Sequence, residues 1–326
     1  MKALFVGYGS IAKRHIKNLQ KLYPDTEISL CRHTQEPVPG IKTFFSLDDA
    51  LEEKPDMVFI TNPTSLHLET ALKVARRGCH MLIEKPLSHS TKHVDKLMKL
   101  VREKNLCIML GYNLRFHKSM LMIKDLLNKG IIGRVLSARA EAGQYLPDWR
   151  PETDYTSSYS ASAQLGGGVI LDLSHEIDYI RWFLGEAREV SCFSGKLSDL
   201  EIKTEDTADI LLKLESGVIA NIHLDYIQHA PSRFFKIIGT EGSIKWTSCV
   251  GVSLSLTKDK TWSTVRADKK SDMKQTYIDE LKHFVESIMS KQKPSVNELD
   301  GKAVLEIALA AKQSSRKNKV VRMVGK

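Results

Sequence analysis

The chain begins with a short apolar run that leads straight into a glycine-containing turn and then into a helical pattern. The run covers residues 2–6, the turn covers residues 7–12 (GYGSIA), and Ile16 and Leu19 continue an apolar helix face. Glycines let the backbone approach a pyrophosphate at the positive end of a helix, so this order predicts a dinucleotide-binding turn. Ala12 replaces the last glycine of the usual fingerprint and is still small enough for the helix to pack closely on the strand. An ordinary tight turn is the alternative interpretation.

Length and composition favour a globular protein of two domains. The chain has 326 residues, of which 42% are hydrophobic and 27% are charged, and such a chain can bury an ample core in each domain. Met1 leads directly into the first strand, so we expect no secretory signal, and no apolar stretch approaches the roughly 18 residues of a membrane span. Five scattered cysteines without metal-ligand spacing indicate free thiols and a cytoplasmic location.

The net charge of +9 raises the question of an acidic partner. Basic residues are dispersed along the chain, and the one dense run, residues 316–319 (RKNK), has no interleaved aromatic residues. We therefore expect no nucleic-acid partner and no membrane partner. An anionic cofactor or substrate explains the excess equally well, and a solvated surface explains most of it.

Strand and helix patterns alternate through residues 1–118, which predicts a Rossmann domain with a doubly wound parallel sheet that binds NAD(P). The predicted strands are residues 4–6, 28–31, 57–60, 81–83 and 108–111, and the predicted helices are residues 11–22, 47–53, 66–77 and 91–104.

Residues 119–326 have a different pattern, which predicts an α+β domain with an open, mostly antiparallel sheet for substrate binding and oligomerisation. The fold class is therefore α/β with this second domain appended. A polar segment at residues 151–164 is too long for a turn and is typical of a lid or binding loop. The predicted helices are residues 120–129, 168–184, 275–290 and 300–317, and the predicted strands are residues 135–145, 189–193, 207–214, 218–226, 234–239, 243–246, 252–256 and 320–324.

A charged pair, Glu84-Lys85, follows the apolar run at residues 81–83 and precedes Pro86. The carboxyl end of a parallel strand is where doubly wound sheets bind their ligands. Pro86 restricts Lys85 to an extended backbone, so we expect its side chain to project from the strand end. There the ammonium group can donate a hydrogen bond to a reacting hydroxyl and stabilise negative charge on it. A surface ion pair is the alternative.

Three glycines, residues 166–168, open a predicted helix that carries Asp172 and His175. Residues three apart lie on one helix face, so the carboxylate and the imidazole form a candidate acid–base pair. His175 is suited to accept a hydroxyl proton near neutral pH. A capped helix with a buried, hydrogen-bonded histidine is the alternative.

Together, and in this order, these features resemble the glucose–fructose oxidoreductase and inositol dehydrogenase family (Gfo/Idh/MocA), and the resemblance covers nearly the whole chain. Residues 61–67 (TNPTSLH) are similar to the family's Thr-Pro-Asn-x-x-His loop, with Asn and Pro exchanged. Residues 84–86 match its Glu-Lys-Pro signature, and residues 111–116 (GYNLRF) its following strand end. Residues 166–175 resemble its Gly-Gly-Gly…Asp…His helix, with Ser174 where many members carry Gly.

The resemblance implies an NAD(P)-dependent dehydrogenase that moves a hydride to or from a secondary alcohol of a sugar, cyclitol or nucleotide-linked sugar. It implies that Lys85 orients and polarises the reacting oxygen, that His175 accepts the proton, and that Asp172 positions the substrate or His175. The cofactor-binding residues that it implies are Gly7, Gly9, Ser10, Ile11, Arg32, His33, Thr61, Asn62, His67, Glu84, Lys85 and Asn113.

The choice between NAD and NADP depends on the residues that follow the second strand. No carboxylate stands there to hold the ribose hydroxyls of NAD, and Arg32 occupies the position. Arginine can pair with a 2′-phosphate, which favours NADP. Stacking of Arg32 on adenine with NAD bound is the alternative. We expect no metal, because His89 and His93 lack a third ligand nearby.

Aromatic residues and arginines near the polar loop indicate a sugar ring with an anionic group, as in a nucleotide-sugar, sugar phosphate or acidic sugar. By analogy, bacterial surface-glycan biosynthesis is the context this segment suggests. Packing at a domain interface is the alternative for Trp149. The predicted substrate-binding residues are Lys85, Arg115, Tyr145, Trp149, Arg150, Tyr159, Asp172 and His175.

Two other functions remain open from the sequence. One is an NAD-retaining glycosidase of the same family, in which the sugar is oxidised and then reduced again during bond cleavage. The other is a non-catalytic sensor of NAD(P) and sugar, which would not need the proton acceptor His175. In each case we expect a homodimer or homotetramer that forms through the sheet of the second domain.

Overall fold

The computed structural model describes residues Met1–Met323 and divides into two compact units. The first unit comprises Met1–Asn113 and Tyr277–Leu305, and the second comprises Leu114–Thr276 and the chain from Glu306 onward. This division differs from the single boundary predicted after residue 118, because residues 277–305 belong to the first unit. Each unit is described by itself.

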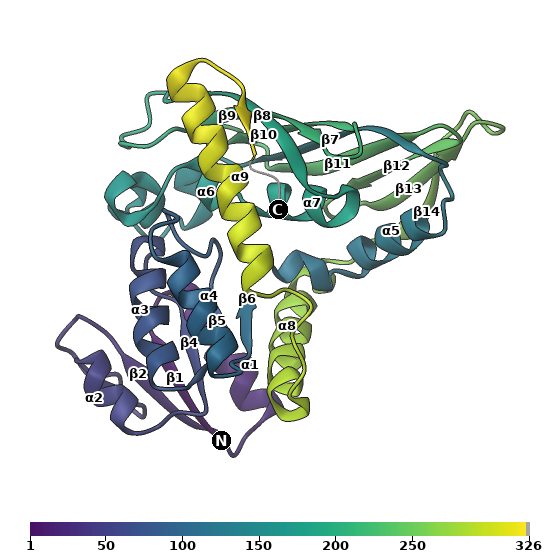
Figure 1. The fold of residues 1–326 in the computed structure, drawn as a ribbon. Helices are drawn as coiled ribbons and strands as arrows, with labels where there is room; N and C mark the ends of the chain where they lie inside the picture. Colours follow the sequence, from purple (N-terminus) through teal and green to yellow (C-terminus); the bar gives the residue numbers. More distant parts are fainter. Residues whose placement is uncertain (324–326) are drawn as a thin grey trace. The chain divides into compact units, whose positions relative to one another are not determined.

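A six-stranded parallel sheet forms the centre of the first unit (Figure 1). From one edge to the other its strands are β3 (Lys42–Phe44), β2 (Glu27–Cys31), β1 (Lys2–Val6), β4 (Met57–Ile60), β5 (His80–Ile83) and β6 (Ile108–Leu110). This is the Rossmann order, which confirms the predicted doubly wound sheet. Every residue of β4 is buried, as expected for a parallel strand with both faces covered.

Four helices connect these strands, close to the predicted positions. They are α1 (Ser10–Leu22), α2 (Leu47–Glu52), α3 (Thr64–Arg76) and α4 (Val94–Glu103). The buried face of α1 contains Ala12, Ile16 and Leu19, as the sequence pattern predicts, and also His15. The imidazole of His15 therefore needs a polar partner inside the unit.

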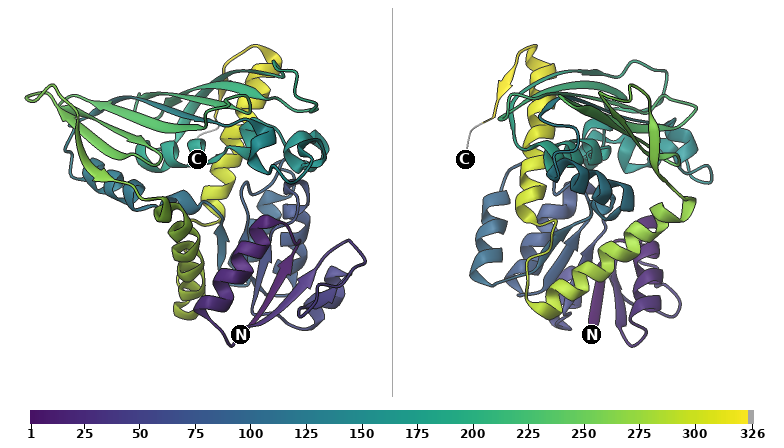
Figure 2. Two further views of the ribbon diagram at one scale, coloured as in Figure 1. Left: turned by 180° about the vertical axis from the view of Figure 1, so that it is seen from behind. Right: turned by 90° about the vertical axis from the view of Figure 1, so that its right-hand side faces the viewer.

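Two helices from the end of the chain complete the first unit. They are α8 (Lys270–Ser290) from Tyr277 on and α9 (Glu298–Lys317) as far as Leu305. Phe284 of α8 packs edge-on against Phe59 of β4, with ring centroids 5.7 Å apart. Figure 1 and Figure 2 show α8 beside α1. An amphipathic pattern predicts that a helix forms, but it does not identify the sheet that the helix covers.

A nine-stranded, mostly antiparallel sheet forms the second unit, as predicted. Buried and exposed residues alternate along β9, so one face of the sheet packs on a core and the other is open. Only β7 and β10 are parallel neighbours among its described strand pairs. In order across the sheet the strands are β14 (Ser263–Ala267), β13 (Gly251–Leu256), β12 (Gly242–Thr247), β11 (Ser232–Gly239), β7 (Val135–Gly143), β10 (Ile219–Asp225), β9 (Thr207–Leu214), β8 (Ala187–Gly195) and β15 (Val321–Arg322).

The two ends of this sheet differ from the sequence expectations. The sequence patterns do not predict β14. The predicted strand at residues 320–324 is observed only as the short β15, and Val324 lies outside the described residues.

Helices pack on the covered face of this sheet (Figure 1 and Figure 2). They are α5 (Lys118–Asn128) against β13, α6 (Val169–Asp172) against β9 and β10, and α7 (His175–Leu184) against β7 and β10. The polar segment at residues 151–164 forms short 3₁₀ turns, among them η3 (Tyr155–Ser157) and η4 (Tyr159–Ala161). It is therefore irregular, as predicted.

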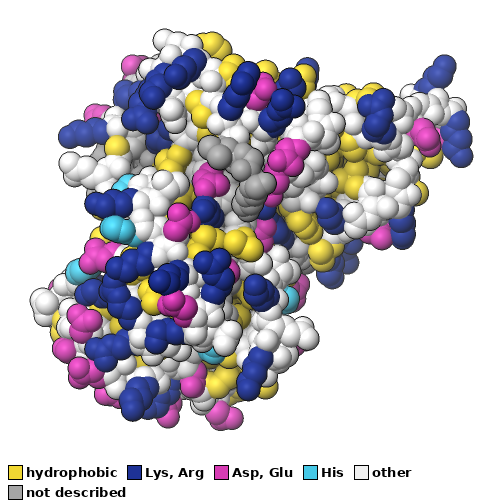
Figure 3. Space-filling view, viewed as in Figure 1, with side chains coloured by type: hydrophobic (Ala, Val, Ile, Leu, Met, Phe, Trp, Pro, Cys, Tyr) yellow, Lys and Arg dark blue, Asp and Glu magenta, His cyan; other side chains and the backbone are white. Residues whose placement is uncertain are grey.

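The surface carries charges of both signs. Figure 3 shows Lys and Arg side chains scattered over the face in view and interspersed with Asp and Glu. Among the helices of residues 1–323, none has both the length and the hydropathy that a membrane span requires.

Candidate active site

The turn after β1 lies close to the loop that follows β4. Gly7 has a φ of +95°, and a Cβ atom there would lie 2.8 Å from the backbone nitrogen of Asn62. The hydroxyl of Thr61 donates a hydrogen bond to the backbone oxygen of Val6 at 3.0 Å, which fixes the two segments to each other. A larger residue at position 7 would separate them, so this glycine is required by packing as well as by its backbone conformation.

The start of α1 is open to a ligand. Gly9 stands at the N-cap, where no side chain hydrogen-bonds to the helix, and Ser10 and Ile11 form the first turn. A Cβ atom on Gly9 would meet no protein atom within 4 Å. Backbone donors at a helix N-terminus beside open space suit a pyrophosphate. The turn therefore fits a dinucleotide.

A cavity of about 580 Å³ opens beside this turn in the first unit. Its wall includes Gly7, Tyr8 and Asn62, and also Arg32 and His33, which follow β2. The guanidinium of Arg32 lies 5.9 Å from the ring centroid of Tyr8, within reach of a cation–π contact. Four of the predicted cofactor residues thus border one cavity that has an aromatic and cationic wall.

His67 of α3 joins two loops at the carboxyl edge of the sheet. Its Nδ1 lies 2.8 Å from the backbone oxygen of Pro86, and its Nε2 lies 2.8 Å from that of Asn62. Burial lowers the pKa of His67, and a neutral ring donates from only one of these nitrogens. Because both ring nitrogens face the main chain, the geometry gives His67 a supporting position behind the loops.

Glu84, at the end of β5, points to the interior of the first unit. Its Oε1 lies 2.8 Å from Nε2 of the fully buried His15. A Cβ atom on Gly111 would lie 2.9 Å from Oε2 of Glu84, so a side chain at that position would strike the carboxylate. No role was predicted for His15 from the sequence, although a histidine among the apolar positions of α1 was a signal for one. Lys85 and Asn113 follow β5 and β6, respectively.

Asp172 is the centre of a hydrogen-bonded group in the second unit. Its carboxylate is buried and accepts hydrogen bonds from Tyr159 Oη, from Ser160 Oγ at 2.6 Å and from Tyr226 Oη at 3.0 Å. Burial and the charge of Asp172 raise the pKa of both tyrosines well above the usual value. The tyrosines therefore remain donors at neutral pH. Sequence reasoning did not identify Ser160 or Tyr226, because they reach Asp172 from other elements.

The predicted continuous helix at residues 168–184 is wrong. Helix α6 ends at Asp172, and α7 begins at His175. Leu173, with φ −95° and ψ 40°, leaves the helical conformation. The carboxylate and the imidazole thus belong to two helices that meet at a bend, so their spacing on one helix face does not apply.

The glycines before α6 bring the polar loop to Asp172. A Cβ atom on Gly167 would clash with the backbone of Tyr159 and Ser160, and one on Gly168, with φ +102°, would clash with Glu205. A side chain at position 167 would push the loop away. The glycine run therefore positions the hydroxyl donors of Asp172.

Arg115 lies in an internal ion pair of the second unit. Its Nε and one terminal nitrogen donate to Asp178 at 2.9 and 2.6 Å, and both side chains are buried. The guanidinium also lies 5.5 Å from the ring centroid of Trp182. This bidentate pair gives Arg115 a structural contact, and its expected contact with substrate stays a prediction.

Aromatic side chains gather beside the Asp172 group. Trp149 meets Tyr226 edge-on at 5.4 Å and donates from Nε1 to the backbone oxygen of Gln144 at 3.1 Å. Arg150 and Trp149 line a small hollow together with Ser160. Tyr145 lies apart from this hollow, against the ring of His229 at 4.2 Å.

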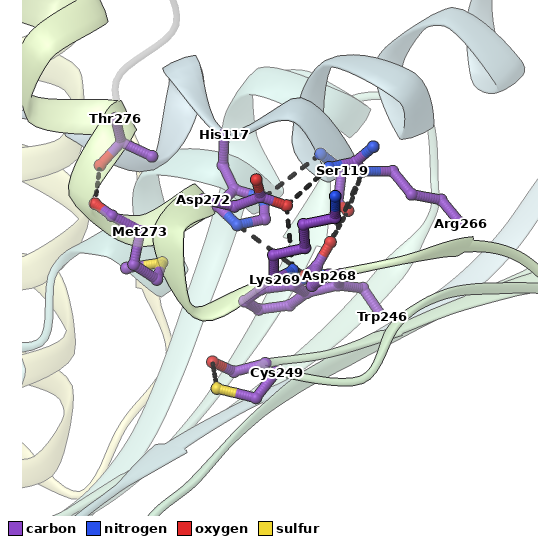
Figure 4. Close-up of polar contacts among 11 residues, drawn as sticks. His117, Ser119, Trp246, Cys249, Arg266, Asp268, Lys269, Asp272, Met273 and Thr276 are labelled. Carbon is purple, nitrogen blue, oxygen red and sulfur yellow. Dashed lines mark hydrogen bonds and ion pairs between the residues drawn. The ribbon is translucent and has the colours of Figure 1, made fainter.

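Within residues 1–323, one group of three side chains has the composition of a metal site (Figure 4). Hydrogen-bond donors of the protein already contact its two carboxylates. It consists of His117, Asp268 and Asp272 in the second unit. Asp268 accepts hydrogen bonds from Ser119 Oγ and, at 2.7 Å, from Trp246 Nε1. Asp272 is paired with Arg266 at 2.7 Å. The group therefore links α5, β12 and β14 to the start of α8 as a hydrogen-bonded network.

Comparison with known proteins assigns the chain to a family. Residues 1–112 match the oxidoreductase family with an NAD-binding Rossmann fold, and residues 120–245 match the GFO/IDH/MocA C-terminal domain. The chain belongs to the Gfo/Idh/MocA family. It is therefore an NAD(P)-dependent oxidoreductase, as the sequence resemblance implies.

Individual Gfo/Idh/MocA relatives are similar over their whole length. Myo-inositol 2-dehydrogenase of Thermotoga maritima is 26% identical, with 99% of this chain and 98% of the relative covered. The NAD⁺-dependent scyllo-inositol 2-dehydrogenase of Bacillus subtilis is 24% identical over 99% and 96% of the two chains. A solved structure of levoglucosan dehydrogenase with NADH and levoglucosan superimposes with a TM-score of 0.86, at 20% identity and 99% coverage of both chains.

Replacement of Gly9 by Ala tests the cofactor turn. Because the added methyl group meets no protein atom, we expect Gly9→Ala to change the free energy of unfolding by no more than about 1 kcal/mol. We expect its Kd for NADH to rise at least about tenfold, since the methyl group occupies the space for the pyrophosphate. Fluorescence titration and urea unfolding measure the two effects. Gly7→Ala is the contrasting variant and should destabilise the fold. NADH affinity unchanged in Gly9→Ala would contradict the assignment.

Proposed function

We propose that this protein is a dehydrogenase or reductase for a secondary alcohol of a sugar, sugar acid, nucleotide-linked sugar or cyclitol. The observation that carries the proposal is the Asp172 carboxylate held by three hydroxyl donors directly before His175. A carboxylate fixed in this way, three residues before an imidazole in the chain, suits the handling of a hydroxyl proton. The names of the relatives, which are inositol and levoglucosan dehydrogenases, support a polyhydroxylated substrate.

Three side chains have roles in the proposed reaction. Lys85 donates a hydrogen bond to the reacting oxygen and stabilises the negative charge that develops on it. His175 accepts the hydroxyl proton during oxidation and returns it during reduction. Asp172 orients the substrate hydroxyl or His175, because its own position is fixed by Tyr159, Ser160 and Tyr226.

The first unit supplies the cofactor site in this proposal. Bound NAD or NADP provides the hydride acceptor or donor. The turn at Gly7 and Gly9 with the start of α1 holds the pyrophosphate, and the cavity walled by Arg32 and His33 holds the adenosine end. The other residues proposed to contact the cofactor are Ser10, Ile11, Thr61, Asn62, Glu84, Lys85 and Asn113, with His67 behind them.

The residues that line the hollow near Asp172 indicate which chemical groups the substrate carries. Trp149 offers an apolar surface for a sugar ring, and Arg150 offers a positive charge for an anionic group. Ser160 lines this hollow and also donates a hydrogen bond to the Asp172 carboxylate. We propose that a sugar with an acidic or phosphate group lies against these residues, as expected of an enzyme in surface-glycan biosynthesis.

Variants of His175 and Lys85 test the proposed chemistry. We expect His175→Gln to keep its affinity for NADH and to lose about 10²- to 10⁴-fold in kcat, because the proton acceptor is gone. Lys85→Met should lose a comparable factor. Nicotinamide absorbance during turnover of candidate sugar acids, nucleotide-sugars and cyclitols measures the rates. His89→Gln, an exposed histidine, is the control.

Two outcomes would favour the other functions. Turnover without a net change in nicotinamide absorbance would indicate the NAD-retaining glycosidase. Full biological activity of Lys85→Ala would indicate a sensor.

Arg32 makes NADP the proposed cofactor. We expect NADPH to bind at least about tenfold more tightly than NADH, since a guanidinium can pair with the 2′-phosphate. Arg32→Ala should weaken NADPH binding by about that factor and leave NADH binding nearly unchanged. Fluorescence titrations with NADPH and NADH measure the two affinities. Arg76→Ala, which changes an exposed arginine, is the control. A tenfold preference of the unmodified protein for NADH would refute the assignment.

The open face of the nine-stranded sheet is the proposed oligomer interface. Phe193 of β8, Leu211 of β9 and Ile219 of β10 lie on one face by strand register and are 76%, 46% and 50% exposed. Exposed apolar side chains on one face are typical of an association surface. We propose a homodimer or homotetramer through this face.

Phe193→Asp tests this interface. A buried charge opposes association, so we expect a lower oligomeric mass by analytical ultracentrifugation than for the unmodified protein. Met289→Asp is the control, because Met289 is 71% exposed on α8 in the first unit. An unchanged mass in Phe193→Asp, or a loss of mass in the control alone, would exclude the sheet face.

A further inference from the structure

Two buried titratable side chains of the first unit, His15 and Glu280, form with the partly buried Glu84 what we term the Glu84 cluster. His15 and Glu280 are both fully buried. The His15 imidazole contacts the Glu84 carboxylate at 2.8 Å. Within the described residues, neither carboxylate oxygen of Glu280 has a hydrogen-bond partner, and neither does Nδ1 of His15. Buried polar atoms without partners are uncommon, so this cluster requires an explanation.

The packing of α8 places Glu280 in this cluster. Tyr277, Glu280 and Phe284 share one face of the helix, since they are three and four residues apart. Tyr277 meets the ring of His15 edge-on at 6.2 Å, and Phe284 meets Phe59 of β4 at 5.7 Å. The side chain of Glu280 therefore enters the unit between two contacts that fix the helix.

An ionised carboxylate would be costly at this position. A buried charge without hydrogen bonds loses its hydration and gains nothing in return, so the group takes up a proton instead. Burial raises the pKa of Glu280 well above its ordinary value, and the negative charge of Glu84 raises it further. Glu280 is thus a neutral acid beside an ionisable neighbour.

We propose that Glu280 is a positioning residue, which stays un-ionised so that Glu84 carries the only negative charge of the Glu84 cluster. This inference rests on the proposed function, in which Glu84 and Lys85 serve the cofactor and the reacting oxygen. Glu84 directly precedes Lys85, and His15 holds its carboxylate. A displacement of Glu84 therefore shifts the backbone that carries Lys85.

Ionisation of Glu280 would break this arrangement. Two carboxylates in apolar surroundings repel each other, and Glu84 is the one that can move toward solvent, since its side chain is 14% exposed. Besides His15 within the cluster, the titratable groups that face it are His67 from α3 and Tyr277 from α8, with Arg14 stacked on Tyr277 at 4.3 Å. None of these groups has been assigned a proton transfer in the proposed reaction.

The test compares cofactor affinity over pH in three proteins. NADH titrations of the unmodified protein, Glu280→Gln and Glu286→Gln run from about pH 6 to about pH 10, above the ordinary pKa of Glu. In the unmodified protein we expect Kd to rise about tenfold for each pH unit beyond the ionisation of Glu280. Glu280→Gln cannot ionise and should lack this rise. Glu286 is exposed on the same helix and paired with Lys282, so Glu286→Gln should follow the unmodified protein.

Two further measurements do not need a cofactor. The infrared difference spectrum between the unmodified protein and Glu280→Gln should contain the carbonyl stretch of a protonated carboxylic acid. The free energy of unfolding provides the other measurement. Between the ordinary Glu pKa of about 4.3 and the raised value, the folded state holds the extra proton, so stability falls as the pH rises. Glu280→Gln should lose this part of the pH dependence.

The outcomes separate this inference from the proposed function. If neither NADH nor NADPH binds, the infrared band and the unfolding data still decide the state of Glu280, while the proposed function fails. If Glu280→Gln keeps the pH dependence of the unmodified protein, or the infrared band is absent, the inference is overturned. Glu280→Met is the second neutral variant, since Glu280 makes no hydrogen bond within the described residues that Met would lose. Failure of both variants to fold would also overturn it, because the fold would then need the charge.

Discussion

The close approach of two backbones, at Gly7 after β1 and Asn62 after β4, is the constraint on which the first unit depends. Only a glycine at position 7 permits it, and the Thr61 hydroxyl fixes it by donating to the strand end at Val6. His67 then holds Asn62 to Pro86, so the loops after β4 and β5 are tied together. This contact between two main-chain segments thus fixes the carboxyl edge of the parallel sheet. The cavity beside the turn and the Glu-Lys-Pro segment (residues 84–86) lie along that edge.

A glycine also permits a close approach of two backbones in the second unit. Gly167 has no side chain where the loop of Tyr159 and Ser160 approaches α6. The hydroxyl groups of that loop then satisfy a carboxylate that would otherwise be buried without partners. In both units, glycines at sheet and helix ends bring polar groups within hydrogen-bond distance.

Local pattern predicted most of the fold. The apolar runs and the turn at residues 7–12 predicted the parallel sheet except its edge strand β3, and alternation predicted the second sheet except β14. The features that the sequence pattern did not predict depend on tertiary contacts. The bend at Leu173 depends on packing around α6, and the pairing of Arg115 with Asp178 depends on two segments that are distant in sequence. The hydrogen bonds that Asp172 accepts from Ser160 and Tyr226 also depend on tertiary contacts.

Parts of α8 and α9 belong to the first unit, although they follow most of the second unit in the chain. The order of synthesis therefore affects how the first unit folds. The residues that cover Phe59 and Leu110 are encoded after every strand of the second sheet except β15. Domains that are continuous in sequence can fold in turn as they leave the ribosome. Here part of the hydrophobic core of the first unit stays uncovered until residues 277–305 have been synthesised, and a fragment cut after residue 118 would keep that surface exposed.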